Sequence, residues 1–247
     1  MPHKLDKNII EKKMAIAGEI GLYYYMYYTT LFMWGVEYLG WEIFMMAAML
    51  APKTFEEEFF NIAFEESLNA IELLSNIDIP YVFVHDDLAD KNGPIFPPDW
   101  YDKYIFPRYE ELWRKIKSKG KKIIFVADGN MEYFLKPLKE LGIDGVMFEN
   151  PATNFDKILD VFGVDIVICG MDTYLLTFGT PKDISSHVDL ICKKTEGLIG
   201  FAICSPGGIH NKIPIENLIA YFDARVRNGF THGNWQKGEI NAAKKLV

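Results

Sequence analysis

Several acidic, amide and imidazole side chains in this sequence directly follow short apolar runs that are typical of buried strands. The clearest run is Ile123–Ala127, which lacks polar alternation, as expected of a strand buried on both faces. Asp128 and Asn130 follow it, and Gly129 between them is expected to free the turn and to admit a ligand close to the backbone. Parallel α/β folds place their chemistry at the carboxyl ends of strands. This stretch therefore predicts a functional site centred on Asp128.

The same placement at other expected strand ends supplies further candidates. Carboxylates gathered at one mouth repel each other unless they hold a cation, protons or a donor-rich ligand, so Glu149 and Asp172 are expected to raise the pKa of Asp128. The candidate catalytic groups, which suit proton transfer or direct contact with a substrate, are Asp128, His210 and Asp86. The candidates for substrate binding are Asp87, Asn130, Glu149, Asp172 and Ser205. Each residue taken singly also fits an ordinary turn, helix cap or loop position.

A cation at this mouth is an open alternative. Asp128, Glu149 and Asp172 would supply oxygens, with Cys169 or His210 as a further ligand. Their spacing matches no recognised metal motif, so no metal ligand is assigned. His85 precedes Asp86 and is expected to point away from it, as a hydrogen-bonded core histidine.

Strands and helices alternate along the chain, which predicts a parallel sheet with crossover helices. We expect one domain over residues 1–247, with an N-terminal arm over residues 1–20 and a peripheral tail over residues 229–247. Thr54 is the expected N-cap of the second long helix. The expected strands are 22–30, 81–85, 123–127, 145–148, 165–169 and 198–203, and the expected helices are 35–51, 54–75, 99–118, 131–141, 155–162, 182–195 and 215–227.

Composition and charge narrow the classes of partner. The net charge of −8 and the pI of about 5.2 argue against binding to a nucleic-acid backbone. The three cysteines have no CxxC spacing, which indicates a reducing, cytoplasmic setting. The apolar run Gly21–Leu50 is interrupted by Glu37 and Glu42, so we interpret it as a buried strand and helix rather than a membrane span.

A string of motifs then resembles a known family. The stretch Val84–Asn130 contains HDDLADKNGPIFPPDW and ends in FVADGN, and it is followed by LKELGIDGVMFENP, GMDTYLL, FGTPKDI and PIENLIAYFDA. Together they resemble the uroporphyrinogen decarboxylase superfamily from about Gly35 to Arg227. The resemblance is nearest to the methyltransferase branch, which includes methylcobamide:coenzyme M methyltransferases and corrinoid-dependent demethylases. It implies an α/β fold of the TIM-type (β/α) barrel class, shortened at its N-terminus.

Departures from the family pattern change what the resemblance implies. Zinc methyltransferases of this family carry a histidine and two cysteines where this chain has Val126, Asp128 and Gly208, so no Cys/His zinc site is expected. The arginines that hold porphyrinogen carboxylates in the decarboxylases have no counterpart before Gly21. An acidic mouth also repels a polyanionic porphyrinogen.

The resemblance therefore implies methyl transfer in one-carbon metabolism, with a small-molecule methyl donor or acceptor and a corrinoid protein as partner. Decarboxylation of uroporphyrinogen in porphyrin biosynthesis and a non-catalytic binding subunit are the alternatives. A shortened barrel leaves an open sheet edge, so we expect either the arm Pro2–Ala17 or a second copy of the chain, as a further partner, to cover it.

Overall fold

The computed structural model describes residues 5–19, 24–27, 29–163, 165–198, 200–204 and 209–229. The chain divides into two compact units, Met1–Val167 and Ile168–Val247. Each unit contains strands followed by helices, so the class is α/β, as expected. The assignment of residues 1–247 to a single domain stays a prediction.

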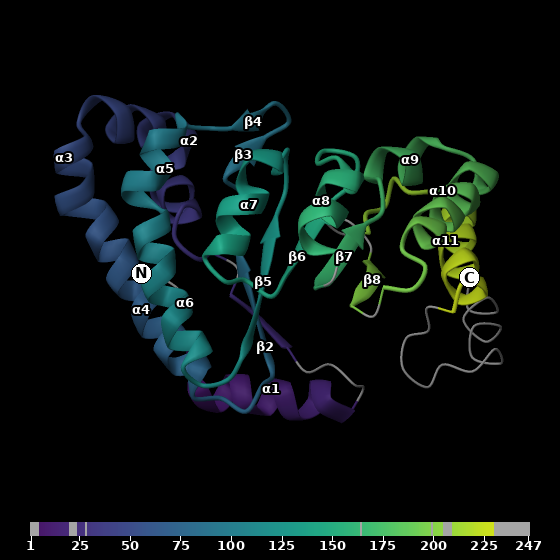
Figure 1. Cartoon of the computed structure of the whole chain (residues 1–247), viewed down its shortest axis with the longest axis horizontal. Coiled ribbons are helices and arrows are strands. Elements are labelled where there is room, and N and C mark those ends of the chain that lie inside the picture. The colour runs from purple at the N-terminus through teal and green to yellow at the C-terminus, as the bar shows by residue number, and fades with distance from the viewer. Residues whose placement is uncertain are drawn as a thin grey trace. The chain divides into compact units, whose positions relative to one another are not determined.

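The first unit is built on four parallel strands, in the order β1 (Tyr24–Tyr27), β2 (Tyr81–His85), β5 (Lys122–Ala127) and β6 (Gly145–Glu149) (Figure 1). β2 begins and ends where the sequence predicts. Its register with β5 places His85 opposite Val126. The carboxyl ends of β2 and β5 therefore lie at the same edge, and the residues that follow them start from neighbouring points.

Nine helical segments of the described chain belong to this unit. A short antiparallel pair, β3 (Ala89–Asp90) and β4 (Gly93–Pro94), was not expected from the sequence. The nine helical segments are α1 (Lys7–Glu19), α2 (Met33–Leu50), α3 (Pro52–Phe55), the π-helix η1 (Glu56–Phe60), α4 (Asn61–Ser75), α5 (Pro98–Tyr104), α6 (Phe106–Lys117), α7 (Glu132–Glu140) and α8 (Phe155–Phe162).

Two local predictions for these helices are wrong. Thr54 is not an N-cap, because α3 begins earlier, at Pro52, where proline suits the first helical turn. The helix expected over residues 99–118 is two helices, α5 and α6, which meet at Ile105. Pro107 lies at the start of α6 and has no backbone N–H, so it cannot continue the hydrogen bonds of α5.

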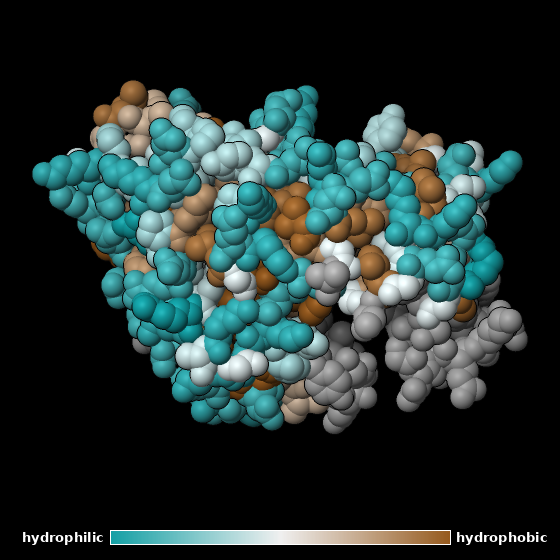
Figure 2. Space-filling view, viewed as in Figure 1, coloured by the Kyte–Doolittle hydropathy of each residue, from teal (hydrophilic) through white to brown (hydrophobic). Residues whose placement is uncertain are grey.

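The expectation of a buried helix near residues 35–51 holds for one side of α2 only. Trp34, Phe44 and Ala48 are buried, whereas Ile43 and Leu50 are among its exposed apolar residues. Figure 2 shows a mainly hydrophilic surface, with hydrophobic residues over the region where α2 leads into α3. Across the described ranges, no helix has both the length and the apolar content needed to cross a bilayer.

An aromatic cluster fixes the loop that follows β2. Phe96 stacks on Trp100 with ring centroids 4.3 Å apart. The Tyr101 hydroxyl donates to the carbonyl oxygen of Leu88 at 2.7 Å and accepts from the amides of Ile95 and Phe96. Because the loop is held at both ends by one buried tyrosine, the chain just after Asp87 has a defined path.

The boundary between the units falls within β7 (Ile166–Gly170), and the second unit continues with α9 (Thr173–Phe178), α10 (Pro181–Lys194), β8 (Phe201–Cys204) and α11 (Ile215–Arg227). The helix α9 was not expected from the sequence. Thr180 and Asp183 form a capping box at the start of α10. The side-chain amide of Asn217 donates to the carbonyl oxygens of Leu176 and Gly179 at 3.0 and 2.9 Å, which connects α11 to α9.

Candidate functional site

Three polar side chains converge where β2 and β5 end. His85 Nε2 lies 3.3 Å from Asp87 Oδ1, and the backbone amide of Asp128 donates to the same oxygen at 2.9 Å. Each of the three residues offers a nitrogen or oxygen atom within 4.8 Å of the others. The side chains of His85 and Asp87 are 8% and 23% exposed, and Asp128 is exposed. The cluster thus runs from the edge of the core to the surface.

Strand alternation explains why His85 and Asp87 meet. The ladder with β5 continues beyond β2, because the Asp86 amide donates to the Val126 carbonyl oxygen at 3.2 Å. Residues two apart on extended backbone share a face, so His85 and Asp87 point together while Asp86 points away. The expectation that His85 and Asp86 diverge is correct. Sequence reasoning missed that the same alternation brings His85 to Asp87.

The turn after β5 is held by its own chain. Gly129 has φ of +81°, and a Cβ at this position would lie 2.4 Å from the carbonyl oxygen of Ala89. The Thr153 hydroxyl donates to the Gly129 carbonyl and accepts from the Met131 amide, both at 2.9 Å. The close approach that glycine permits is therefore used by Ala89, and this corrects the expectation that it admits a ligand.

The two aspartates of the cluster have opposite pKa shifts. Burial acts to raise the pKa of Asp87, but the hydrogen bond and charge of His85 and the Asp128 amide outweigh it, so this pKa lies below its usual value. Asp128 is exposed as a residue, but partial burial of its carboxyl group raises its pKa, and the nearby negative charge of Asp87 raises it further. The upward direction for Asp128 matches the expectation. The like charge that contributes is that of Asp87.

Asp86, an expected catalytic residue, is fully buried. Its Oδ2 accepts from the amides of Leu31 and Phe32 and from the Tyr109 hydroxyl, at 2.7, 3.0 and 2.6 Å, and its Oδ1 accepts from the Met33 amide at 2.9 Å. Burial raises the pKa of Asp86 to about 6, although these donors act to lower it. The geometry gives Asp86 the task of binding the start of α2 to the end of β2.

Two further candidates of the first unit, Asn130 and Glu149, follow Asp128 in the sequence. Asn130 Oδ1 accepts from the backbone amide of Glu132 at 3.1 Å, and the backbone amide of Asn130 donates to the carbonyl oxygen of Asp90 at 2.8 Å. These bonds make Asn130 a residue of the turn before α7. Glu149 is the last residue of β6 and is half-buried.

The remaining candidates belong to the second unit. Asp172 is the N-cap of α9, and its Oδ1 accepts from the Leu175 amide at 3.0 Å. His210 is exposed, and its Nδ1 accepts from the Lys212 amide at 3.2 Å. Ser205 lies outside the described residues. Among the described residues, the group of acidic, histidine or cysteine side chains close enough to share one ion is His85, Asp87 and Asp128, rather than the alternative set of Asp128, Glu149 and Asp172.

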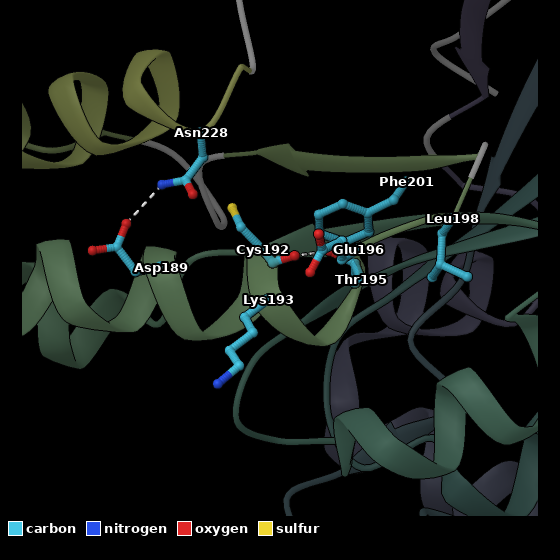
Figure 3. Close-up of a pocket in the computed structure, with 8 residues that line it drawn as sticks. All are labelled: Asp189, Cys192, Lys193, Thr195, Glu196, Leu198, Phe201 and Asn228. Carbon is cyan, nitrogen blue, oxygen red and sulfur yellow. Dashed lines mark hydrogen bonds between the residues drawn. The ribbon is translucent and has the colours of Figure 1, made fainter.

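A pocket of about 440 Å³ in the second unit lies away from the strand tips of that unit. Figure 3 shows Cys192 and Thr195 near the end of α10, with Phe201 at the start of β8 and the hydrogen bond between Asp189 and Asn228. In α/β folds the catalytic edge is the carboxyl end of the strands, whereas this pocket adjoins the amino end of β8. No residue expected to be functional lines it.

The family's thiolate zinc site does not fit the residues present. Val126 is an apolar residue with 7% exposure and has no ligand atom, and Asp128 offers a carboxylate in place of a thiolate. Gly208 lies outside the described residues. The expectation of no Cys/His zinc site stays a prediction that rests on residue types.

These features define an α/β protein whose polar cluster lies at the carboxyl ends of parallel strands. The family described as uroporphyrinogen decarboxylase (URO-D) matches residues 81–227, and the chain belongs to this family. A solved methyltransferase from Methanosarcina mazei is similar in structure, with a TM-score of 0.67 and 16% sequence identity. The similarity covers 89% of this chain and 64% of that one. No curated protein sequence matches the chain.

At this level of identity the structural similarity establishes the fold alone. The fold is the URO-D-like, TIM-type α/β class that the motif string predicts, and it is shared with a methyltransferase. The chain spans 64% of the length of that methyltransferase, so activity, substrate and partner are matters for proposal.

Proposed function

We propose that this protein is a methyltransferase of one-carbon metabolism that acts with a corrinoid protein. The observation that carries the proposal is the acidic cluster at the tip of β5, where Asp128 occupies a position that carries a zinc-binding cysteine in methyltransferases of this family. Family membership and the shared fold support the same reading. A corrinoid on the partner would supply or accept the methyl group.

Asp128 is the residue we assign to contact with the reacting ligand. It is the exposed member of the cluster, and its backbone amide donates a hydrogen bond to Asp87 Oδ1 at 2.9 Å. The pKa of its carboxyl group lies above the usual value, so Asp128 holds a proton more readily than an ordinary surface aspartate does. Asp87 and His85 act as positioning residues, because they fix the location and charge of Asp128.

Asn130 and Glu149 stay proposed substrate-binding residues of the first unit. In the second unit Ser205 stays a proposed substrate-binding residue and His210 a proposed catalytic residue, whereas we assign the Asp172 carboxylate to the cap of α9 rather than to substrate. Asp86 is proposed to act indirectly, by holding α2 against β2. A cytoplasmic location and self-association also remain proposals.

The cluster disfavours the decarboxylase alternative. Uroporphyrinogen carries many carboxylates, and the two carboxylates of Asp87 and Asp128 would repel them. The described cluster supplies one imidazole and no guanidinium to compensate. Decarboxylation is therefore retained only as an outcome of the test below.

The test is a methyl-transfer assay on the purified chain in both directions. In one direction, methylcobalamin is the donor and a panel of thiols is the acceptor; in the other, reduced cobalamin accepts methyl groups from methoxylated aromatic compounds. The absorption spectrum of the cobalamin reports both reactions. We expect turnover with at least one compound above the level without protein.

Uroporphyrinogen is offered to the same preparation, with carbon dioxide release as the readout. Release of carbon dioxide without methyl transfer would replace our proposal with the decarboxylase. Absence of both reactions would contradict an enzymatic role and favour a non-catalytic binding subunit.

A further inference from the structure

The donor set at the tips of β2 and β5 differs from the oxygen donors considered as an alternative in the sequence and from the Cys/His set of the family's zinc methyltransferases. It combines one imidazole nitrogen with two carboxylates, and it contains no thiolate. Mixed nitrogen and oxygen donors suit divalent first-row transition metals, whereas magnesium and calcium prefer oxygen alone. We propose that His85, Asp87 and Asp128 bind one divalent transition-metal ion.

The spacing of the donor atoms fits a common ion after a small closure. Two ligands that each lie about 2.0–2.2 Å from one metal are roughly 3–3.4 Å apart. His85 Nε2 and Asp87 Oδ1 are already 3.3 Å apart. The full group spans no more than 4.8 Å, so loading requires one carboxylate to move inward by about 1–2 Å. Asp128 can make this movement because its side chain is exposed.

The other two ligands are held in place before any metal arrives. His85 is on β2 and its side chain is 8% exposed, so its ring has little freedom. The backbone amide of Asp128, which follows the neighbouring strand β5, fixes Asp87 Oδ1. Two fixed ligands and one adjustable ligand reduce the loss of conformational freedom on binding.

Three protein ligands also leave coordination positions for another molecule. Structural zinc sites are usually closed by four protein ligands, whereas catalytic sites keep an open position for water or substrate. Since Asp128 faces solvent, the open positions adjoin the surface. The site would thus present the ion as a Lewis acid to a small ligand that carries an oxygen, nitrogen or sulfur donor.

The experiment measures metal binding without any methyl-transfer substrate, so its result is independent of the proposed function. Metal is removed from the full chain with a chelator, and the chelator is removed by dialysis. Separate samples are then titrated with Co²⁺, Zn²⁺ or Mg²⁺. Calorimetry gives affinity and stoichiometry, and the visible spectrum of bound Co²⁺ reports its ligands. We expect one equivalent of Co²⁺ or Zn²⁺, much weaker binding of Mg²⁺, and no thiolate-to-cobalt charge-transfer band.

Three variants test the assigned ligands. His85→Gln, Asp87→Asn and Asp128→Ala should each weaken Co²⁺ binding at least about 100-fold. Asp87→Asn keeps an oxygen that can accept the Asp128 amide, so it separates loss of charge from loss of fold. Asp102→Asn removes an exposed carboxylate of α5 and should leave binding unchanged. Circular dichroism confirms folding of each variant.

Three results would overturn the proposal: no stoichiometric Co²⁺ or Zn²⁺, unchanged affinity in the folded Asp87→Asn and Asp128→Ala proteins, or a thiolate charge-transfer band. The first would leave His85 and Asp87 as an ordinary hydrogen-bonded pair. The last would place the ion on Cys169, Cys192 or Cys204. None of these results would decide whether the chain transfers methyl groups.

Discussion

In the first unit, the ends of β2 and β5 bring Asp87 and Asp128 toward one another, whereas in the second unit the end of β7 uses Asp172 as a helix cap. Both situations begin with an aspartate just after a buried strand. Asp87 and Asp128 belong to a group with His85, and one of them remains exposed. The Asp172 carboxylate accepts from the Leu175 amide two positions into α9. The hydrogen-bond donors around a carboxylate at a strand tip therefore decide its role. It either joins a group of side chains that can bind a ligand, or it caps the following helix.

Asp86 and Asp87 show the same contrast between adjacent residues. Asp86 faces three backbone amides and a tyrosine hydroxyl in the core, and Asp87 faces His85 and Asp128 at the surface edge. The direction of the side chain from extended backbone decides between the two environments. Substitutions at these positions distinguish structural aspartates from site-facing ones.

Asp86→Ala should lower the free energy of unfolding by about 3–5 kcal/mol, because it leaves four donors, three of them buried, without their acceptor. Tyr109→Phe removes one of these bonds and should cost about 1–2 kcal/mol. Urea unfolding at neutral pH measures both. A loss below about 1 kcal/mol for Asp86→Ala would mean that Asp86 does not hold α2, and its expected catalytic role would regain weight.

The stability conferred by Asp86 should also depend on pH. Its pKa in the folded protein is about 6, above the ordinary value of 3.8, so the folded state binds a proton more tightly than the unfolded state. This contribution is fully present below about pH 4 and is lost as the pH rises through about 6, which corresponds to about 3 kcal/mol. Relative to Asp86→Asn, the wild-type protein should become less stable from pH 4 to pH 7. A constant difference between the two proteins in urea unfolding would contradict this assignment.

Gly129→Ala should destabilise the protein by about 2–3 kcal/mol, since a left-handed φ and a clash with the Ala89 carbonyl act together. Gly142→Ala is the matched control. Gly142 has φ of +88° and open space around its Cβ position, so only the backbone term of about 1–2 kcal/mol applies. Thermal unfolding of both variants gives the comparison. Equal losses would show that the Ala89 contact does not constrain the turn that carries Asp128.

Asp172→Ala should cost about 1 kcal/mol through loss of the α9 cap, while Asp172→Asn should change stability by only a few tenths of a kcal/mol, because asparagine caps equally well. Chemical denaturation distinguishes the two. If Asp172→Asn is as destabilising as Asp172→Ala, the charge of Asp172 matters more than its hydrogen bond. Asp172 would then resemble the site-facing aspartates.

The sequence alone predicts an element correctly where one local pattern determines its bounds. β2, α8 and α11 have the bounds that apolar runs and flanking residues predict, and the motif string identified the family. The division of the helix at Ile105 and the π-helix η1 were missed, because each depends on packing around a local interruption. Pro107 is the local sequence feature that indicates the division between α5 and α6.

The candidate site was predictable in part. Asp128 and Asp87 were found because strand tips are readable from apolar runs. His85 was missed because it was interpreted as a core residue, although its spacing of two from Asp87 indicated a shared face. The buried role of Asp86 depends on Leu31–Met33 and Tyr109, which are distant in sequence, and no local pattern reveals those partners.

The central claim is that the charge of Asp128 is functional and that of Asp172 is not. The most direct measurement compares Asp128→Asn with Asp172→Asn in the methylcobalamin assay, since both substitutions remove one charge with little change of shape. We predict a loss of about 100-fold or more in kcat/KM for Asp128→Asn and a change within about twofold for Asp172→Asn, with both proteins folded. Wild-type activity in Asp128→Asn, or an equal loss in both variants, would contradict the account.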